Sequence, residues 1–405
     1  METNTSSPII NSFPPRAGHH HDVVVVGCRA AGAATAMLLA RAGLRVLVLE
    51  RGAEGTDTLS THALMRGGVM QLRRWGLLDA MVDAGTPPIR RTTFTYAGER
   101  VEISIKASHG VDALYAPRRT LLDPSLAAAA LDAGAQIRYR TAVVDVLRSR
   151  GRVIGVRARN ADGTIEDITA GLVVGADGVS SIVAQVVGAE LLHRGRHATA
   201  ITYGYWTGLQ TTGYEWVYRA DACTGVIPTN GGQACVFASA GRDHIGRGGV
   251  DVIMRIAAAG DPDLAARLAA ATPPDGTRTW GGQVGHVRRA HGPGWALVGD
   301  AGYFKDPISA HGITDALRDA ELLARAVTVG CGDDGAMARA LGDYEEIRDQ
   351  LSLNLFHTVD RIASNEWDDG EIAVLLRQLS SSMSDEVDTL AALDGAESFA
   401  TAVAP

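Results

Sequence analysis

The chain has 405 residues, of which 46% are hydrophobic and 21% charged, as in globular proteins with two or three domain-sized units. Its formal net charge of −8 argues against nucleic-acid binding, because such proteins need a basic surface to displace counterions. The apolar runs are too short to span a membrane. The cysteines lack C-x-x-C spacing, which argues against zinc and redox disulfides and favours a cytoplasmic location; they are Cys28, Cys223, Cys235 and Cys331.

Residues 1–21 are rich in Ser, Thr, Asn and Pro and end in three consecutive histidines. This composition predicts a leader without a packed structure, although three histidines could also bind a metal ion. The segment has no basic stretch followed by an apolar one, so we expect no secretion signal.

A strand–helix–strand unit is predicted at residues 22–50. Residues 22–27 are a run of valines ending in glycine, typical of a parallel strand that is buried on both faces. Residues 30–42 are rich in alanine and leucine and favour a helix that ends at Gly43. Residues 45–50 form a second apolar strand, which gives this βαβ unit its usual length.

The turn between the first strand and the helix reads G-C-R-A-A-G, residues 27–32. A dinucleotide-binding turn has the pattern G-x-G-x-x-G, in which the helix N-terminus binds a pyrophosphate. Gly27 suits the tight turn and Gly32 the close packing of helix on strand, but Arg29 replaces the middle glycine. The arginine could neutralise phosphates, or it could point to solvent in a degenerate turn.

Glu50 ends the second strand, roughly 20 residues after Gly27. An acidic residue at this distance binds the ribose hydroxyls in the adenosine half of a dinucleotide. Because it would repel the 2′-phosphate of NADP, the motif favours FAD or NAD. The alternative is a glutamate that lies on the surface at the end of a strand.

The rest of the chain alternates between helical and extended patterns. Helices are predicted at residues 67–85, after Asp123-Pro124, near 310–329 and over about 335–395. Strands are predicted within 91–106, 136–148, 152–159, 172–178 and 295–302. An antiparallel sheet with a turn at 228–232 is predicted over 198–239 and 278–290.

These elements predict an α/β protein in which a discontinuous Rossmann-type domain receives an inserted antiparallel-sheet domain. A helical C-terminal region would follow, and its helices would either cover the active site or form a homodimer interface. The expected parts are the leader (1–21), the nucleotide-binding domain (22–90, 115–190 and 291–330), the substrate domain (91–114 and 191–290) and the C-terminal region (331–405).

Two later motifs complete a three-part pattern. One strand ends in a D-G motif at Asp177, and another ends in Gly299-Asp300 and continues through Pro307 into a helix. With the first turn, these motifs resemble those of the class A FAD-dependent aromatic hydroxylases, the p-hydroxybenzoate-hydroxylase-like superfamily, over about residues 22–330. The resemblance implies a Rossmann-type FAD-binding domain and selects FAD over NAD.

For the adenosine half of FAD, the resemblance implies that Glu50 binds the ribose and that Arg51 lies beside the adenine. Arg119 matches the family arginine near the phosphates and the ribityl chain. Val143 would contact the adenine through its backbone, although Val144 fits the alignment equally well.

For the flavin half, the resemblance implies that Asp177 stabilises the FAD site and assists NAD(P)H. Asp300 would hold a ribityl hydroxyl, and Pro307 would lie over the isoalloxazine ring. Cofactor contacts are also expected at other positions of the three motifs: Gly27, Arg29, Ala31, Gly32, Gly299, Ala310, His311, Gly312 and Ile313.

The helix after Pro307 suits a reduced flavin, because a helix N-terminus stabilises negative charge at flavin N1 and the C2 oxygen. The family pattern is P-x-x-G-Q-G, but here Ala310 replaces the first glycine and His311 the glutamine. Asp315 lies near the same helix start. His311 could be a cationic partner of the reduced flavin, or it could only cap the helix or pack in the loop.

Residues 58–68, T-L-S-T-H-A-L-M-R-G-G, pass close to the flavin in this fold. Together with Arg29 they resemble a bacterial subgroup with a G-x-R-x-A-G turn and a T-x-S-T-H loop. His62 is therefore a candidate acid–base group or flavin contact. Alternatively, Ser60 or Thr61 caps the next helix and His62 packs. The catalytic candidates are thus His62, His311 and Pro307.

The inserted sheet contains alternating aromatic residues. Trp216, Tyr218 and Phe237 could line an apolar substrate pocket, although aromatic residues in strands more often belong to the core.

The resemblance implies an NAD(P)H-dependent FAD monooxygenase. NAD(P)H would bind transiently and reduce the flavin, O2 would form a hydroperoxide at flavin C4a, and one oxygen atom would hydroxylate or epoxidise a small organic substrate. We expect an aromatic or polyketide-like substrate of secondary metabolism, such as an antibiotic precursor, and no metal.

Three alternatives remain open. A flavin-dependent halogenase would carry a W-x-W-x-I-P motif, which this sequence lacks, and a catalytic lysine, for which only Lys106 and Lys305 are present. A flavin oxidase, dehydrogenase or double-bond reductase related to geranylgeranyl reductases would use the same FAD motifs. A flavoprotein-like fold that only binds a partner would tolerate the departures at Arg29 and Ala310.

Overall fold

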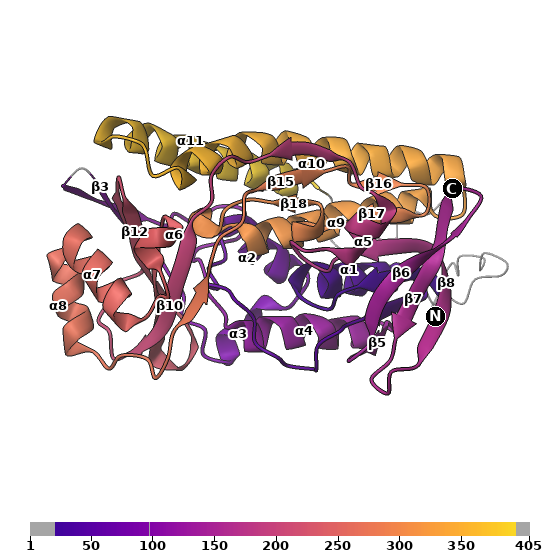
Figure 1. Cartoon of the computed structure of the whole chain (residues 1–405), viewed down its shortest axis with the longest axis horizontal. Helices are drawn as coiled ribbons and strands as arrows, with labels where there is room; N and C mark the ends of the chain where they lie inside the picture. The colour runs from indigo at the N-terminus through magenta and orange to yellow at the C-terminus, as the bar shows by residue number, and fades with distance from the viewer. Residues whose placement is uncertain (1–20, 97, 394–405) are drawn as a thin grey trace, which may run out of the picture.

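The computed structural model describes residues 21–96 and 98–393, and Figure 1 shows two sheets at opposite ends of its long axis. The long C-terminal helices run along one side of both ends. The mixed α/β architecture predicted from the sequence is confirmed. The predicted leader lies outside the described residues except for His21, with which the first strand begins.

The first sheet has eight strands and a parallel centre, with the order β16-β17-β8-β1-β2-β5 and β6 and β7 attached through β8. Strand β1 pairs in parallel with both β2 and β8. The strands are β1 (His21–Val26), β2 (Val46–Leu49), β5 (Gln136–Arg138), β6 (Ala142–Ser149), β7 (Arg152–Arg159), β8 (Ile165–Gly175), β16 (His291–Gly292) and β17 (Trp295–Leu297).

The valine run of β1 is buried on both faces, as its composition predicts. Val23 and Val25 face a core formed with α1 (Ala30–Arg41), α4 (Arg119–Asp132) and α9 (Gly312–Gly330). Val24 and Val26 face a second core formed by β6, β7 and α5 (Ile182–Val187). Polar residues would be desolvated on either face, so the strand has no polar alternation.

The second sheet has seven strands in the order β14-β10-β13-β12-β11-β3-β4 and is antiparallel except where β11 pairs in parallel with β3. Three helices that the sequence analysis did not assign pack beside it: α6 (Arg242–Ile245), α7 (Val250–Gly260) and α8 (Pro262–Ala270). The strands are β3 (Arg91–Tyr96), β4 (Glu99–Ser104), β10 (Ala200–Thr207), β11 (Tyr214–Arg219), β12 (Ala222–Pro228), β13 (Gln233–Ala240) and β14 (Arg278–Trp280).

The stretch 278–290 does not belong to one sheet as predicted. Its first part is β14, but β15 (His286–Arg288) pairs with β9 (Leu191–Arg194) and β18 (Tyr303–Phe304) in a separate three-stranded sheet. The single helix expected at residues 67–85 is also divided, into α2 (Arg66–Arg74) and α3 (Leu78–Asp83), because Gly76 adopts a φ of +76° between them.

Helix α4 begins five residues before the position predicted from Pro124. Arg119 and Asp123 form an i,i+4 ion pair at 2.9 Å on its first turns, with both side chains about nine-tenths buried. Pro124 removes one backbone hydrogen bond inside the helix. The buried ion pair stabilises the first turns of α4, and Asp123 also pairs with Arg29 at 3.4 Å, so the helix extends upstream of the proline.

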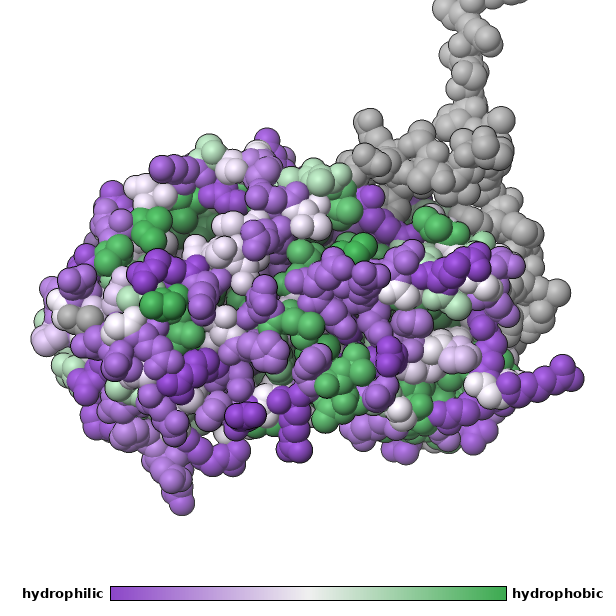
Figure 2. All heavy atoms as spheres, turned by 90° about the horizontal axis from the view of Figure 1, so that it is seen from above, coloured by the Kyte–Doolittle hydropathy of each residue, from purple (hydrophilic) through white to green (hydrophobic). Residues whose placement is uncertain are grey.

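The C-terminal region consists of α10 (Asp334–Ala363) and α11 (Asp369–Ala392), capped by Asp333 and Asp368. Helix α11 contacts α2 in the first domain and β3 in the second sheet. On the face shown in Figure 2, apolar residues are scattered among polar ones. Among the helices of residues 21–96 and 98–393, none has the length and apolarity that crossing a bilayer requires.

Ala310 adopts a left-handed conformation, with φ +50° and ψ +29°, between a 3₁₀ turn and α9. An L-residue with a Cβ is strained there by roughly 1–2 kcal/mol, whereas glycine is not. We therefore expect Ala310→Gly to raise the free energy of unfolding by about 1 kcal/mol, measured by urea denaturation of the FAD-free protein.

The matched control is Ala128→Gly at an exposed position inside α4. There glycine relieves no strain and should lower stability by about 0.5–1 kcal/mol. The same loss at position 310 would contradict the assigned strain.

Candidate active site

A cavity of about 670 Å³ extends from the carboxyl ends of β1 and β2 to β10 in the second sheet. Open α/β sheets bind ligands at this edge, and the volume lies within the range of ligand pockets. Its walls come from the first turn, the segments 58–63, 141–143, 176–182 and 300–316, and single residues of α4, β10 and β14.

At the first turn, α1 lies so close to the sheet that no side chain fits between their backbones. Gly27 has a φ of +103°, and a Cβ there would lie 2.5 Å from the Ala176 carbonyl oxygen. A Cβ at Gly32 would lie 2.0 Å from the Gly27 carbonyl oxygen. Arg29 has a φ of −97°, so its backbone does not require glycine. Two glycines are therefore obligatory, and the substitution at position 29 leaves the turn intact.

The Arg29 side chain reaches across the turn instead of into free solvent. Its Nη1 lies 3.3 Å from the Thr56 carbonyl oxygen and 3.4 Å from Asp123 Oδ2. Asp123 also accepts two hydrogen bonds of 2.9 Å from Arg119. Two arginines thus share one carboxylate beside the N-terminus of α1, which leaves net positive charge where a pyrophosphate would bind.

Glu50 is held in one orientation at the end of β2. Its two carboxylate oxygens accept hydrogen bonds from the backbone N–H groups of Cys28, at 2.8 Å, and Gly52, at 2.6 Å. The side chain still lines the cavity, so lone pairs remain for ribose hydroxyls. Arg51 and Val143 also line this part of the cavity.

Asp177 lines the cavity but is occupied in capping α5. Its carboxylate accepts hydrogen bonds from the Ser181 hydroxyl at 2.5 Å and from the Ile182 N–H at 2.7 Å. Burial raises the pKa of Asp177 above its ordinary value, against the effect of these bonds. The D-G motif therefore fixes the shape of the turn between β8 and α5.

Gly299 places the next motif against α1. Its φ is +59°, and a Cβ there would lie 2.9 Å from the Ala31 Cβ. The following residue, Asp300, lines the cavity, and burial raises its pKa to about 6 while Lys305 acts in the opposite direction. Pro307, Ala310, Gly312 and Ile313 line the adjacent wall.

His311 points away from this wall, unlike the cofactor contact expected from the sequence. The residue is 1% exposed and its Nε2 lies 3.2 Å from both carboxylate oxygens of Glu386 in α11. Burial raises the pKa of Glu386, but His311 and Arg318 outweigh this effect and hold it at about 2. The ionised Glu386 thus draws the histidine away from the cavity.

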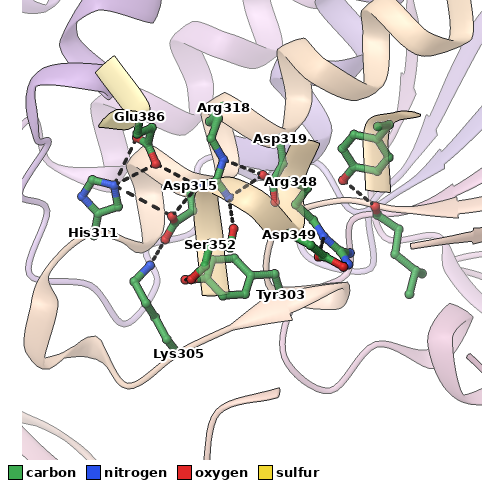
Figure 3. A network of polar contacts seen from close by, with 12 residues as sticks. Tyr303, Lys305, His311, Asp315, Arg318, Asp319, Arg348, Asp349, Ser352 and Glu386 are labelled. Atoms are coloured by element: carbon green, nitrogen blue, oxygen red, sulfur yellow. Dashed lines mark hydrogen bonds and ion pairs between the residues drawn. The ribbon is translucent and has the colours of Figure 1, made fainter. Parts of the chain in front are cut away.

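Figure 3 shows the buried ion network to which this pair belongs. Arg318 of α9 is fully buried and binds Asp319 at 2.7 Å, Glu386 at 2.8 Å and Asp315 at 3.3 Å. Lys305 forms a further ion pair with Asp315. Within the described part of the chain, His311, Asp315 and Glu386 are close enough to bind a metal ion, but Lys305 and Arg318 already neutralise these carboxylates.

His62 lines the part of the cavity beside the second sheet and has a strained conformation, with a φ of +69°. It is 1% exposed, its Nε2 hydrogen-bonds to the Tyr205 hydroxyl, and its Nδ1 has no partner among the described residues. The Arg118 guanidinium stacks on the Tyr205 ring at 3.6 Å. Burial, Arg118, Arg119 and Arg278 lower the pKa of His62 well below 6.5, so the imidazole is neutral at pH 7.

The predicted aromatic wall lies in the core and not on the cavity. Trp216 donates a hydrogen bond to Thr92, and Tyr218 packs against Trp367. Which ring faces the ligand depends on packing between neighbouring strands, and the alternation of residues in the sequence does not specify that packing. The aromatic residues that line the cavity are Tyr203, Trp280, Tyr303 and Phe304, whereas Trp216, Tyr218 and Phe237 are buried together.

Sequence reasoning did not assign Lys305 to the cofactor or Glu386 to any site. Lys305 was noted only as one of two lysines, and its place between Gly299-Asp300 and Pro307 was the available signal. No local pattern marks Glu386, because its partners lie on α9, far from it in sequence.

Comparisons with known proteins identify an FAD-binding family and its fold. A family profile described as FAD binding domain matches residues 20–356. The digeranylgeranylglycerophospholipid reductase of Methanothrix thermoacetophila is 30% identical over 354 residues, covering 82% of this chain and 85% of that protein.

Two solved structures share the fold at low sequence identity. The flavin-dependent brominase Bmp2 has a TM-score of 0.76 and 18% identity, over 95% of this chain and 98% of that chain. PqsL, a probable FAD-dependent monooxygenase from Pseudomonas aeruginosa, has a TM-score of 0.70 and 20% identity, over 90% and 99%.

The network predicts a pH-dependent contribution of Glu386 to stability. Its pKa falls from 4.5 to about 2 on folding, so its stabilising effect is fully present above pH 4.5 and is lost as the pH falls toward 2. We expect Glu386→Gln to lower the free energy of unfolding at pH 7 by about 3 kcal/mol, because Arg318 then lacks a buried counter-ion. Urea denaturation at pH 7 and pH 3 should show a smaller difference from wild type at pH 3.

Glu371→Gln is the control on the same helix, because Glu371 pairs with Arg361 at the surface. It should change stability much less at either pH. An equal loss for both variants would refute the buried network as the cause.

Proposed function

The chain belongs to the FAD-binding domain family, and on that premise we propose that it is an NAD(P)H-dependent monooxygenase acting on a small, partly aromatic organic substrate. When bound, FAD would accept electrons from NAD(P)H and activate O2. The coarser statement, an FAD-dependent oxidoreductase of this fold, follows from the family.

The described residues fit the shape and charge of FAD. Gly27 and Gly32 let α1 pack closely against the strand, which presents its N-terminus to a pyrophosphate, and Arg119 adds positive charge to the cavity. Glu50 is oriented toward a ribose, and the cavity continues past Asp300 to the second sheet. A ligand with an adenosine half and a second ring system would occupy both ends.

The shape of the far end is the observation that carries the proposal. There the cavity is bounded by Tyr203, Trp280, Phe304 and the neutral His62. Aromatic walls exclude water, which protects the reactive oxygen species of such enzymes and strengthens polar contacts with the substrate. Most lining residues belong to the nucleotide motifs and the segments beside them, which supports a small substrate over a long lipid.

His62 is the residue that would hold or move a proton at this end. With Nε2 bonded to Tyr205, its Nδ1 is the ring atom left for a substrate hydroxyl or carbonyl. The neutral imidazole could accept a proton there or donate one, according to its tautomer. The strained φ of +69° supports a functional reason for its orientation.

A double-bond reductase is the second candidate. The 30% identity to a digeranylgeranylglycerophospholipid reductase, over most of both chains, favours it. In such a reaction the substrate double bond would receive a proton from the protein, a role that His62 could also fill. The aromatic far end would then accept an alkene shorter than that lipid.

Oxygen labelling separates the two candidates. We expect the FAD-loaded protein, supplied with NAD(P)H and a panel of phenols and polyketide-like aromatics under ¹⁸O2, to form a product with one labelled oxygen atom, detected by mass spectrometry. A product that gains two hydrogens without label, and that also forms without O2, would favour the reductase. A protein that remains colourless after incubation with FAD would refute both.

The role of His62 has its own test. We expect His62→Gln to lower the rate of product formation roughly 100-fold, as for the loss of a general acid–base group, while NAD(P)H still reduces the flavin. Stopped-flow absorbance measures reduction, and chromatography measures product.

His193→Gln, in β9 and outside the cavity lining, is the control and should leave both rates unchanged. Normal product formation by His62→Gln would show that His62 only packs.

A further inference from the structure

The two lysines of the chain lie in opposite environments. Lys106 is exposed in the loop after β4, whereas the Lys305 side chain is 3% exposed and lines the cavity. Lys305 pairs with Asp315, and its ammonium lies 4.9 Å from the centre of the Tyr303 ring. Burying a lysine is costly unless its charge is paired, as that of Lys305 is with Asp315.

Lys305 shares its part of the cavity with the start of α9. Gly312, Ile313 and Ala316 of the first turns line the same wall, and the free N–H groups at the start of a long helix favour negative charge. The cavity therefore has two regions that suit an anion. One lies at the start of α1 with Arg119, and the other at the start of α9 with Lys305.

FAD carries negative charge at two places that match these regions. The pyrophosphate is always charged, and the first turn of α1 is built for it. The isoalloxazine ring becomes negative at N1 and the C2 oxygen only when it is reduced. With the pyrophosphate assigned to α1, the reduced ring is the anion left for the region of Lys305.

We propose that Lys305 is the cation that stabilises the reduced, anionic flavin, and that Asp315 is the counter-ion that limits this effect. The inference rests on FAD binding, which the proposed function also requires, but not on oxygen transfer. It assigns to Lys305 the part that the sequence suggested for His311, whose side chain faces Glu386 instead.

Asp315 does not pair with Lys305 alone. Arg318 lies 3.3 Å from Asp315 Oδ1 and the His311 ring 3.9 Å from it, so this carboxylate serves more than one cation. Glu386 binds both Arg318 and His311, which fixes the positions of these two side chains beside Asp315. Figure 3 shows Lys305 reaching Asp315 from the side opposite Glu386.

Asp306 also lies on this wall and accepts hydrogen bonds from Thr199. Asp300, on the same wall, acts against Lys305. Burial raises its pKa to about 6, and Lys305 and Arg119 lower it while Asp315 and Asp319 raise it. Because Lys305→Met removes one of the cations that lower this pKa, the measurements are made at pH 8, above it, where a change in the protonation of Asp300 contributes least.

The test is the midpoint reduction potential of bound FAD, measured at pH 8 by equilibrium reduction with a reference dye. We expect Lys305→Met to lower the potential, because the reduced flavin loses its cation. Asp315→Asn should raise it, because Lys305 loses its counter-ion. The double variant, which removes both charges, should return close to the wild-type potential.

Lys106→Met is the matched control, because it removes the exposed lysine, and it should leave the potential unchanged. Should Lys305→Met fail to fold, the double variant leaves no unpaired charge at this site and is compared with Asp315→Asn. The reduction potential of the double variant must then be lower than that of Asp315→Asn.

An unchanged potential in Lys305→Met at full FAD occupancy, or equal potentials of the double variant and Asp315→Asn, would overturn the inference. Either result would leave the proposed monooxygenase intact, because product labelling does not depend on it. Failure of the wild-type protein to bind FAD would overturn both.

Discussion

The buried guanidinium of Arg318 is the constraint on which the arrangement of this active site depends. It is completely inaccessible to water and binds carboxylates of α9 and α11 as well as the Ser352 hydroxyl of α10. A buried charge that lost these partners would cost several kcal/mol, so the three helices keep their positions together. The start of α9 is thereby directed at the cavity. Lys305 lies beside it, and the His311 side chain points away from the cavity toward Glu386.

Close backbone packing shapes the part of the cavity formed by the nucleotide motifs. Gly27, Gly32 and Gly299 each leave less than 3 Å for an added Cβ, so α1, its strand and the third motif meet without side chains between them. Arg29 is compatible with this packing because its own backbone is extended and its side chain turns toward Thr56 and Asp123. The turn therefore keeps the tight strand-to-helix geometry and carries an added cation.

Function in this fold is decided at the end of the cavity away from the nucleotide motifs. Reductases, a brominase and a probable monooxygenase are similar to this chain. The FAD motifs alone therefore do not specify whether oxygen is used or how. In this chain that end combines aromatic side chains with a neutral histidine under strain. Its chemistry supports oxygen transfer to a small substrate as the proposal, with alkene reduction as the competitor.

The fold class, the βαβ unit and the FAD motifs could be predicted from the sequence, because each depends on local requirements such as a buried valine strand or a glycine in a crowded turn. The orientations of individual side chains could not, because they depend on contacts between distant segments. His311 meets Glu386 75 residues later, and His62 meets Tyr205 143 residues later. The sequence pattern predicted Trp216 in the wall of the cavity, whereas the structure places Tyr203 there. Packing between distant segments sets which face of a strand meets the ligand, and no local pattern records it.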